Sequence, residues 1–431
     1  MTKGIEISVL SLLPFVLMLG AIAFLPLFWN HHWEKNKVKL LIAGILSLPS
    51  VIFLIRNGSE MRLVHTIIFD YVPFIILLGS LYVITGGIRL SENIEGKPLV
   101  NLSFLAAGTL LASVMGTTGA AMLLVRPLIQ ANKNREQKVH TLLFLIALAA
   151  NCGGLLSPIG DPPLFMLYLR GAPFTWFLNL LPQWLFVNGV LLAIFFLIDS
   201  YYYKCEPAHE KAQTFPKGGA IKIGGKLNFI WLAGVILSVA LINGRYIEAV
   251  HSSEYLGFIR EGVILLMALS SLLITSARIR ESNNFSWGPI EEVAYLFIGI
   301  FITMVPCLLY LEANAWSLGL ISPRGFFYAS GFLTSFLDNT PTAVTFYSLA
   351  HGLGVRAPGM IAGIPVPLLK AISLGSVFFG SMTYIGNAPN FMIKSIAEEN
   401  NIVMPHFFAY VFKFSLLILF PVFILMQFLF F

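Results

Sequence analysis

The stretch Gly154-Leu-Leu-Ser157-Pro-Ile159-Gly160-Asp161-Pro-Pro163 governs the interpretation of this chain, because it recurs 226 residues later as Gly380-Ser-Met-Thr383-Tyr-Ile385-Gly386-Asn387-Ala-Pro389. Both copies fit the pattern Gly-x-x-[Ser/Thr]-x-Ile-Gly-[Asp/Asn]-x-Pro. Proline and glycine both disfavour a continuous helix. Each copy lies inside a long apolar stretch, so the pattern predicts two interrupted helices at matching positions of an internal repeat.

The composition indicates a membrane protein that crosses the bilayer many times. Of the 431 residues, 57% are hydrophobic and 11% are charged, against about 25% charged in an ordinary soluble domain. Too few charges are present to cover a soluble surface, and we expect the lipid bilayer as the main partner. Lys and Arg fall between apolar runs and form no nucleic-acid-binding face. The first apolar run lacks a cleavage pattern, so we expect a retained helix and not a signal peptide.

Other compositional features exclude particular kinds of site. The three cysteines are odd in number and widely spaced, which favours neither a disulfide framework nor a zinc site. We expect no cofactor apart from Na+ as a coupling or transported ion.

Ten apolar stretches approach the ~20 residues needed to cross a bilayer. They are 7–28, 38–55, 64–88, 140–170, 176–198, 227–241, 258–277, 290–311, 368–396 and 407–431. Two further apolar stretches, 102–129 and 326–353, have polar, helix-breaking centres, Gly116-Thr117-Thr118-Gly119 and Asp338-Asn339-Thr340-Pro341-Thr342. These centres predict re-entrant hairpins, which are tolerated where they are buried in protein or line an aqueous cavity.

The predicted fold is therefore an all-α polytopic membrane protein with about ten transmembrane helices, two re-entrant hairpins and broken fourth and ninth helices. We expect residues 1–199 to form a first repeat, 200–226 a cytoplasmic linker and 227–431 a second repeat. Five helices per half is an odd number, so the two repeats would have opposite orientations, as in many secondary transporters. Sixteen Lys and Arg fall on one side of this layout and eight on the other. That bias predicts both termini outside, and we expect a bacterial inner (plasma) membrane.

The interruptions also predict where ions bind. A break in a helix releases backbone carbonyl and amide groups, and the half-helix ends carry partial charges. Two hairpin tips and two broken helices would converge on one site near the middle of the membrane. Neutral side-chain oxygens suited to a hard cation such as Na+ are offered there by Thr117, Thr118, Ser157, Asn339, Thr340, Thr342, Thr383, Asn387 and Asn390.

Asp161 and Asp338 are the two charged residues at these breaks. A charged Asp at the membrane centre costs about 2.5–3.5 kcal/mol on insertion scales, and function is the usual reason for its presence. Burial disfavours the charged form of a carboxyl group, whereas a nearby Na+ favours it. Each group could therefore hold either a proton or Na+. Asp161 could also cap the half-helix that begins at Pro162, and the two roles can coexist.

Two other charged residues have alternative interpretations. Arg126 lies on the returning arm of the first hairpin. It could snorkel to the membrane surface or pair with an acid, or it could be an anion ligand or a counter-charge for an aspartate. Asp70, within the third predicted helix, could make a buried polar contact or lie near an interface.

At Asn151-Cys-Gly-Gly-Leu-Leu-Ser-Pro-Ile-Gly-Asp-Pro-Pro163 the chain resembles the ion transporter superfamily of NhaD-type sodium/proton antiporters, arsenite permeases, citrate transporters and divalent anion–sodium symporters. The stretches Gly116-Thr-Thr-Gly-Ala120, Leu337-Asp-Asn-Thr-Pro-Thr342 and Gly386-Asn-Ala-Pro-Asn390 stand at the positions of its hairpin tips and second broken helix. This resemblance implies an elevator-type transport domain, a scaffold and a homodimer.

The resemblance also implies two sodium sites. One would involve Thr117, Thr118, Ser157 and Gly160, and the other Asp338, Asn339, Thr340, Thr383 and Asn387. Asn151, which opens the first stretch, joins them as a candidate ligand, and the Na+ itself would be held chiefly by Asp161, Asp338 and Asn339.

The sequence departs from the anion symporters of that superfamily. Their hairpin tips read Ser-Asn-Thr and their broken helix reads Gly-Thr-Pro-Pro, whereas this chain has Gly-Thr-Thr-Gly and Gly-Asp-Pro-Pro. A carboxylate in the site would repel citrate or succinate, so we expect a sodium/proton antiporter. Sodium-coupled uptake of citrate or another small carboxylate is the alternative, and arsenite efflux is a third.

An intramembrane enzyme is a further alternative that the sequence disfavours. Position 158 is Pro, so Pro158-Ile-Gly160-Asp161 lacks the first glycine of the Gly-x-Gly-Asp protease motif. The chain also contains no His-Glu-x-x-His motif and no Gly-x-x-x-x-Gly-Lys motif. We therefore expect a transporter and not an enzyme.

Overall fold

The computed structural model describes residues 8–28, 33, 35–91, 94–206 and 222–431. Within these ranges the protein is almost entirely helical, and its strands are two short antiparallel pairs, β1 (Arg89–Ser91) with β2 (Lys222–Gly224) and β3 (Met360–Ile361) with β4 (Ile364–Pro365). Helices satisfy their own backbone hydrogen bonds, which is the requirement for crossing lipid. Eight helical segments are long and apolar enough to span a bilayer, and three shorter ones are also apolar. The prediction of an all-α polytopic membrane protein is confirmed.

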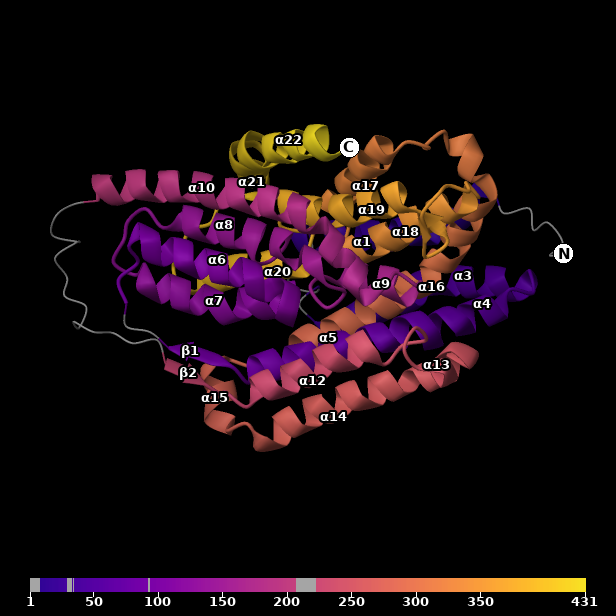
Figure 1. Cartoon of the computed structure of the whole chain (residues 1–431), viewed down its shortest axis with the longest axis horizontal. Helices are drawn as coiled ribbons and strands as arrows, with labels where there is room; N and C mark the ends of the chain where they lie inside the picture. The colour runs from indigo at the N-terminus through magenta and orange to yellow at the C-terminus, as the bar shows by residue number, and fades with distance from the viewer. Residues whose placement is uncertain (1–7, 29–32, 34, 92–93, 207–221) are drawn as a thin grey trace.

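The helices run roughly along the long axis of the molecule (Figure 1). Those before the first interruption are α1 (Leu13–Phe28), α3 (Asn36–Arg56), α4 (Glu60–His65), α5 (Val72–Gly86), α6 (Pro98–Met115) and α7 (Thr117–Ala131). A π-helical segment, Thr66–Tyr71, joins α4 to α5. Later long helices are α10 (Leu181–Cys205), α12 (Asn228–Leu241), α14 (Phe258–Ile274) and α16 (Gly288–Asn314).

The first predicted hairpin is a pair of helices, α6 and α7, that meet at Gly116. Gly116 has φ 84°, a conformation that glycine adopts without strain. The far ends of the pair also meet, because Gly96 N donates to Ala131 O over 2.8 Å. By length and composition α6 alone is a candidate span, so this arm is longer than a short re-entrant segment requires.

The second predicted hairpin consists of α17 (Pro323–Phe336) and α18 (Asn339–Gly352), which pack against each other. Leu337 and Asp338 form its tip, in extended or near-extended backbone. The two pairs are therefore alike in form, although their tips differ in backbone conformation.

The fourth and ninth predicted spans are both interrupted helices. The first consists of α8 (Val139–Leu148), a 3-10 turn at Cys152–Leu156, an extended segment, and α9 (Pro162–Leu169). The second consists of α19 (Val366–Phe378), a 3-10 turn at Phe379–Met382, an extended segment, and α20 (Ala388–Glu399). The breaks predicted from glycine and proline thus occur in the expected places.

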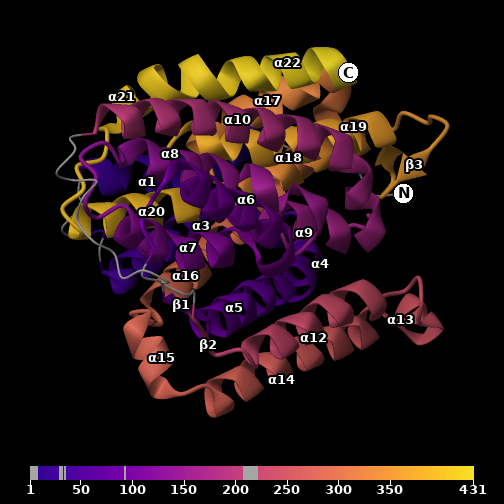
Figure 2. The same cartoon turned by 60° about the vertical axis from the view of Figure 1, so that its left-hand side comes forward.

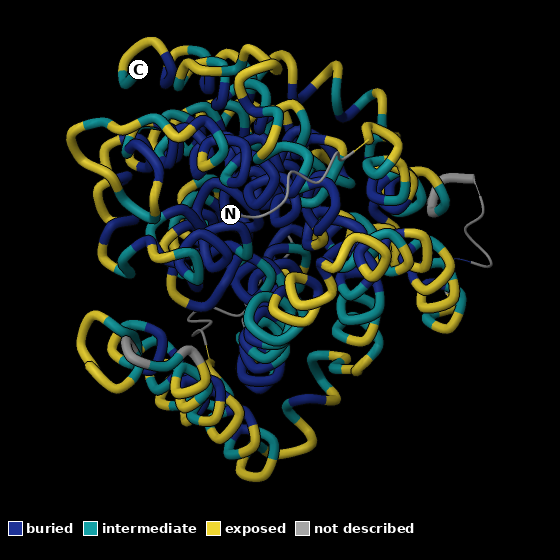
Figure 3. The backbone as a smooth tube through the Cα atoms, turned by 90° about the vertical axis from the view of Figure 1, so that its right-hand side faces the viewer, coloured by how far each residue is buried: buried dark blue, intermediate teal, exposed yellow. Residues whose placement is uncertain are grey.

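Two groups of helices can be followed in the figures. Helix α5 packs against α12 and α14, and these three lie together on one side of the molecule (Figure 2). The hairpins, the interrupted helices and α10 form the other part, with α21 (Phe407–Tyr410) and α22 (Phe420–Phe430) above them (Figure 1). Buried backbone is concentrated in the middle of the molecule and exposed backbone at its rim (Figure 3). Large apolar side chains such as Leu273, 84% exposed, face outward, as lipid contact requires.

Helix α10 extends into the range 200–226 that we predicted as a linker. Helix α10 continues to Cys205, beyond the start of the predicted linker at residue 200. Residues 207–221 of that linker lie outside the described residues. The linker ends in β2, which pairs with β1, so the segment after α5 is joined to the segment before α12.

Candidate ion-binding site

Asp161 lies where both helix pairs and both interrupted helices meet. Its side chain is fully buried, and its carboxylate accepts hydrogen bonds from three neutral side chains. Thr117 Oγ1 at the first tip donates over 3.0 Å, Asn339 Nδ2 at the second tip over 2.9 Å, and Asn387 Nδ2 of the second break over 3.4 Å. No Lys, Arg or His in the described ranges forms an ion pair with it.

The two breaks have the same local conformation. Asp161 has φ −141° and ψ 138°, and Asn387, its counterpart in the repeated pattern, has φ −150° and ψ 139°. Each residue immediately precedes a half-helix that begins at the next position. The matching conformations follow from the matching Gly and Pro positions, while the charge differs between the two copies.

Ser157 and Thr383 hold the two breaks in the same way. The Ser157 hydroxyl accepts from the N–H groups of residues 159 and 160, over 3.2 and 3.1 Å, and donates to Ser113 O over 2.5 Å. The Thr383 hydroxyl accepts from residues 385 and 386 over the same distances and donates to Ser335 O. Each hydroxyl therefore ties its break to the neighbouring hairpin. In this structure both hydroxyls support the site, and the side-chain donors to the Asp161 carboxylate among the described residues are Thr117, Asn339 and Asn387.

Gly160 and Gly386 are required because the backbone folds back closely at each break. A Cβ atom on Gly160 would lie 2.1 Å from the carbonyl oxygen of Gly154, and one on Gly386 would lie 2.6 Å from that of Gly380. Both distances are far below van der Waals contact. Gly160 also contributes its carbonyl to the site, since it accepts from the Thr117 N–H over 2.8 Å.

A chain of asparagine side chains connects the two breaks. Asn387 Nδ2 donates to Asn151 Oδ1 over 3.1 Å, and Asn151 Nδ2 donates to Asn390 Oδ1 over 2.7 Å. Asn390 Nδ2 in turn donates to the carbonyls of Gly380 and Thr383, over 2.8 and 2.9 Å. Asn151 and Asn390 are fully buried. The structure thus gives both residues a positioning role beside Asp161.

Asp338 has a different environment from Asp161. It is half-buried at the start of α18, and its Oδ1 accepts from the Thr340 N–H over 3.1 Å, which is an N-terminal helix cap. Thr342 Oγ1 donates to the Asp338 carbonyl over 3.2 Å. Thr340 and Thr342 are both almost completely buried. The structure therefore places Asp338 at the hairpin tip and gives it no direct hydrogen bond to Asp161 in the part of the chain that it describes.

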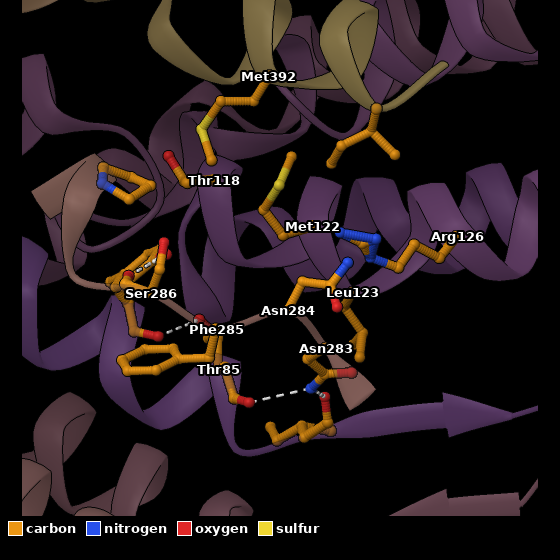
Figure 4. A pocket seen from close by; sticks show the side chains of 15 residues that line it. Thr85, Thr118, Met122, Leu123, Arg126, Asn283, Asn284, Phe285, Ser286 and Met392 are labelled. Carbon is orange, nitrogen blue, oxygen red and sulfur yellow. Dashed lines mark hydrogen bonds between the residues drawn. The ribbon is translucent and has the colours of Figure 1, made fainter. Parts of the chain in front are cut away.

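Arg126 and Thr118 face away from Asp161. Both line a cavity on the other side of α7, together with residues of α5 and of the segment 283–289 (Figure 4). No ion pair joins Arg126 to either aspartate within the described residues. Arg126 is therefore not their counter-charge in this structure.

Asp70 forms an ion pair that the sequence did not reveal. Arg170, at the end of α9, donates from its two terminal nitrogens to the two Asp70 carboxylate oxygens over 3.3 and 3.2 Å. The same guanidinium lies 5.6 Å from the centre of the Tyr347 ring on α18. This pair joins the π-helical segment before α5 to the first interrupted helix and the second hairpin.

Three supporting residues were missed by sequence reasoning. Thr334 Oγ1 donates to Asn339 Oδ1 over 2.8 Å and so orients the amide that bonds Asp161. Ser113 and Ser335 receive the hydrogen bonds from Ser157 and Thr383. Both serines stand three residues before a tip position, Gly116 or Asp338, a correspondence that could have identified them.

A buried charged network at the far end of α7 was also missed. Asp199 is fully buried and contacts Arg135 Nη1 at 2.6 Å, His140 Nε2 at 2.8 Å and Asn101 Nδ2 at 2.9 Å. These contacts join α10 to the base of the first hairpin. The network lies apart from the Asp161 site, and we assign it to support of the fold.

The described residues contain no group of three or more His, Cys, Asp or Glu side chains arranged to hold a metal ion. A transition-metal centre would need such a group, whereas Na+ is bound by carboxylate, carbonyl, hydroxyl and amide oxygens. The surroundings of Asp161 offer that kind of ligand.

Comparison with known proteins adds one finding. A family model described as "putative citrate transport" matches residues 4–431, which is nearly the whole chain. No match was found among curated proteins.

Proposed function

The chain belongs to this citrate-transport family and is therefore a membrane transporter, and we propose that it is a secondary active transporter that exchanges Na+ for H+ at Asp161. The family accounts for transport, and the contacts of Asp161 support cation and proton exchange. We propose a bacterial inner membrane as its location, with both termini outside.

The observation that carries this proposal is the set of partners around Asp161. Its three donors, Thr117, Asn339 and Asn387, are neutral, so they do not neutralise a carboxylate. A fully buried carboxylate without an opposite charge is costly. A proton or a bound Na+ removes that cost, and the two compete for the same oxygens.

The proposed Na+ ligands are arranged around this carboxylate. Asp161 supplies a charged oxygen, Thr117 a hydroxyl and Asn339 an amide oxygen, after a rearrangement of the hydrogen bonds that now join them. Asp338, with Thr340 and Thr342, is a second proposed cation position at the tip of the other hairpin.

Alternating access would follow from the repeated architecture. The two halves have matching hairpins and matching breaks, and we propose that they are inverted repeats. The hairpins, interrupted helices, α10 and α22 would move as an elevator against a scaffold of α1, α3, α5, α12, α14 and α16. The Asp70–Arg170 pair crosses that proposed boundary and would be broken and remade in each cycle. By analogy with the ion transporter superfamily, which the sequence resembles, we propose that the protein is a homodimer.

Sodium-coupled uptake of citrate or a related small carboxylate is the second candidate function. The family description favours it. Citrate would not share the immediate surroundings of Asp161, because two carboxylates there would repel each other. Citrate would therefore need a binding site that is separate from Asp161 and contains a positively charged side chain.

Reconstituted vesicles that contain a pH dye test the first candidate. An imposed Na+ gradient should drive proton movement in the wild-type protein and not in Asp161→Asn. Asparagine should be tolerated structurally, because Asn387 occupies the equivalent position with nearly the same backbone conformation. Unchanged Na+-driven proton flux in Asp161→Asn would remove Asp161 from the mechanism. Labelled citrate uptake without proton exchange would favour the second candidate.

A further inference from the structure

A cleft on the far side of α7 contains an arginine whose charge is not compensated. Two adjoining cavities, of about 130 Å³ and about 380 Å³, share Met122, Leu123, Arg126 and Asn283 among their lining residues. Either volume far exceeds the ~10–15 Å³ that a single water needs. Helices α7 and α20 form one wall, and the end of α5 with the segment 282–289 forms the other. The cleft is thus large enough for a small ligand.

Both helices present one regular face to this cleft. Thr118, Met122 and Arg126 recur every four residues on α7, and they lie in a row in Figure 4. Met392, Ile396 and Asn400 recur at the same interval at α20. Residues spaced by four lie on the same side of a helix. The cleft is therefore built by two helical faces and does not arise from loop packing alone.

The charge of the cleft is wholly positive among the lining residues that the structure describes. Arg126 and Arg89 are the charged members, and none is Asp or Glu. Neither arginine side chain has a hydrogen bond or ion pair to a described residue. An anion would supply the missing partner.

Three arginines differ from Arg126 because a carboxylate neutralises each of them, whereas the buried Arg280 donates instead to the Val83 and Ser271 carbonyls. Arg135, Arg170 and Arg260 are each paired with a carboxylate, Asp199, Asp70 and Glu261 respectively. Arg126 is half-buried, and burying a charge without a partner is costly. Its isolation points to a partner that comes from outside the chain.

Neutral donors complete the cleft beside Arg126. Asn283 is already committed, since its Nδ2 donates to the carbonyls of Gly86 and Ile88 over 2.9 and 2.8 Å. These two bonds hold the backbone next to Asn284. Asn284 itself has φ 50°, a conformation that asparagine tolerates. Asn284 and Thr118 both line the first cavity, and Figure 4 shows Arg126 extending toward Asn284.

We propose that this cleft binds a small multivalent carboxylate of the citrate class, with Arg126 as its principal ligand and Asn284 and Thr118 as further donors. The planar guanidinium matches the two oxygens of a carboxylate. This proposal rests on the second candidate function, carboxylate uptake. It gives citrate a positive site separate from Asp161. Thr118 directly follows Thr117, which bonds Asp161, so the two sites share the start of α7.

Equilibrium binding to the purified full-length protein tests the proposal without requiring transport. Labelled citrate should bind saturably to the wild type and to Asp161→Asn in the absence of Na+. Arg126→Gln should weaken binding at least about tenfold, as expected for a lost charge-assisted hydrogen bond. Arg126→Lys should have an intermediate affinity for citrate, because lysine keeps the positive charge but lacks the planar pair of N–H donors of the guanidinium. Arg56→Gln, an exposed arginine of α3, is the matched control and should bind normally.

Opposite outcomes would overturn the assignment. Unchanged citrate binding in Arg126→Gln would do so, as would equal displacement of citrate by inorganic phosphate. Absence of binding in the wild type would also exclude the site, and would leave Na+/H+ exchange at Asp161 untouched. If the wild-type protein binds citrate but shows no Na+-driven proton flux, the proposed exchange at Asp161 is rejected and the citrate site in the cleft is retained.

A second measurement does not depend on replacing Arg126. In a Cys205→Ser background, Ser286→Cys places a thiol in the wall of the first cavity. Citrate should slow its reaction with a small maleimide at least severalfold, whereas sodium chloride of equal ionic strength should not. Equal labelling rates with citrate and with chloride would contradict the proposal.

Discussion

Asn339 Nδ2 donates to Asp161 Oδ2 over 2.9 Å, although the two residues are 178 positions apart in the sequence. This bond joins the tip of the second hairpin to the break of the first interrupted helix. The Asn339 amide is oriented by Thr334, whose hydroxyl donates to Asn339 Oδ1. One hydrogen bond thus connects elements from the two halves of the chain at the proposed cation site.

Asn339→Ala should therefore affect stability and Na+ affinity together. Removing the amide leaves a buried carboxylate oxygen without its donor, which costs about 1–3 kcal/mol. We expect a lower melting temperature of the detergent-solubilised protein and a higher Na+ concentration for half-maximal proton flux. Asn179→Ala, which removes an amide bonded to the Trp176 carbonyl away from the site, is the control. Equal effects of the two substitutions would show that Asn339 has no special role.

Gly160→Ala should destabilise the protein severely, because its Cβ would lie 2.1 Å from the Gly154 carbonyl oxygen. The backbone at the break would have to move, and the Thr117 N–H would lose its acceptor. Thermal unfolding should show a loss of more than about 3 kcal/mol. Gly189→Ala in α10 has no atom within 4 Å of the new Cβ and should change stability by less than about 1 kcal/mol. Similar melting temperatures for the two variants would contradict the geometry described at the break.

The Asp70–Arg170 pair should influence both the transport cycle and the stability of the fold. The two side chains are only 15% and 14% exposed, so replacing one of them leaves a largely buried charge without its partner, which is destabilising. Asp70→Asn and Arg170→Gln should each change the rate of proton flux severalfold and lower the melting temperature. The double variant should show a non-additive effect in a double-mutant cycle. Strictly additive effects on flux would mean that the contact is not used in the cycle.

The native cysteines report the orientation of the chain. Cys205 is exposed at the end of α10, whereas Cys152 and Cys307 are buried. With both termini outside, the end of α10 faces the cytoplasm. In intact cells a membrane-impermeant maleimide should leave Cys205 unlabelled, and a permeant one should label it. Cys205→Ser identifies the labelled residue, and rapid labelling by the impermeant reagent would reverse the proposed topology.

The breaks could be predicted from sequence because their cause is local. Glycine and proline clustered together disfavour a continuous helix, although α3, α7 and α16 each continue through a single proline. The repeated pattern also predicts that Ser157 and Thr383 are equivalent. The partners of these hydroxyls could not be predicted, because they are backbone carbonyls of other helices, those of Ser113 and Ser335.

The place of Arg126 could not be predicted, because it depends on tertiary packing. Its interval of eight residues from Thr118 indicates a shared face of α7, but not what lies opposite. The opposite wall comes from Asn284 and its neighbours, more than 150 residues away along the chain. Asp338 shows a similar limit, because its cap on the Thr340 N–H depends on the backbone conformation of the hairpin tip.

The two breaks have the same shape but carry different residues, Asp161 in one and Asn387 in the other, and this asymmetry bears on energetics. Under the proposed exchange, the Asp161 carboxyl returns with either one H+ or one Na+, and the same one-for-one exchange would hold at the second proposed cation position, Asp338. Each complete turn then moves no net charge. Membrane voltage would neither drive nor oppose such a cycle, and the Na+ ratio across the membrane would be limited by the pH difference alone.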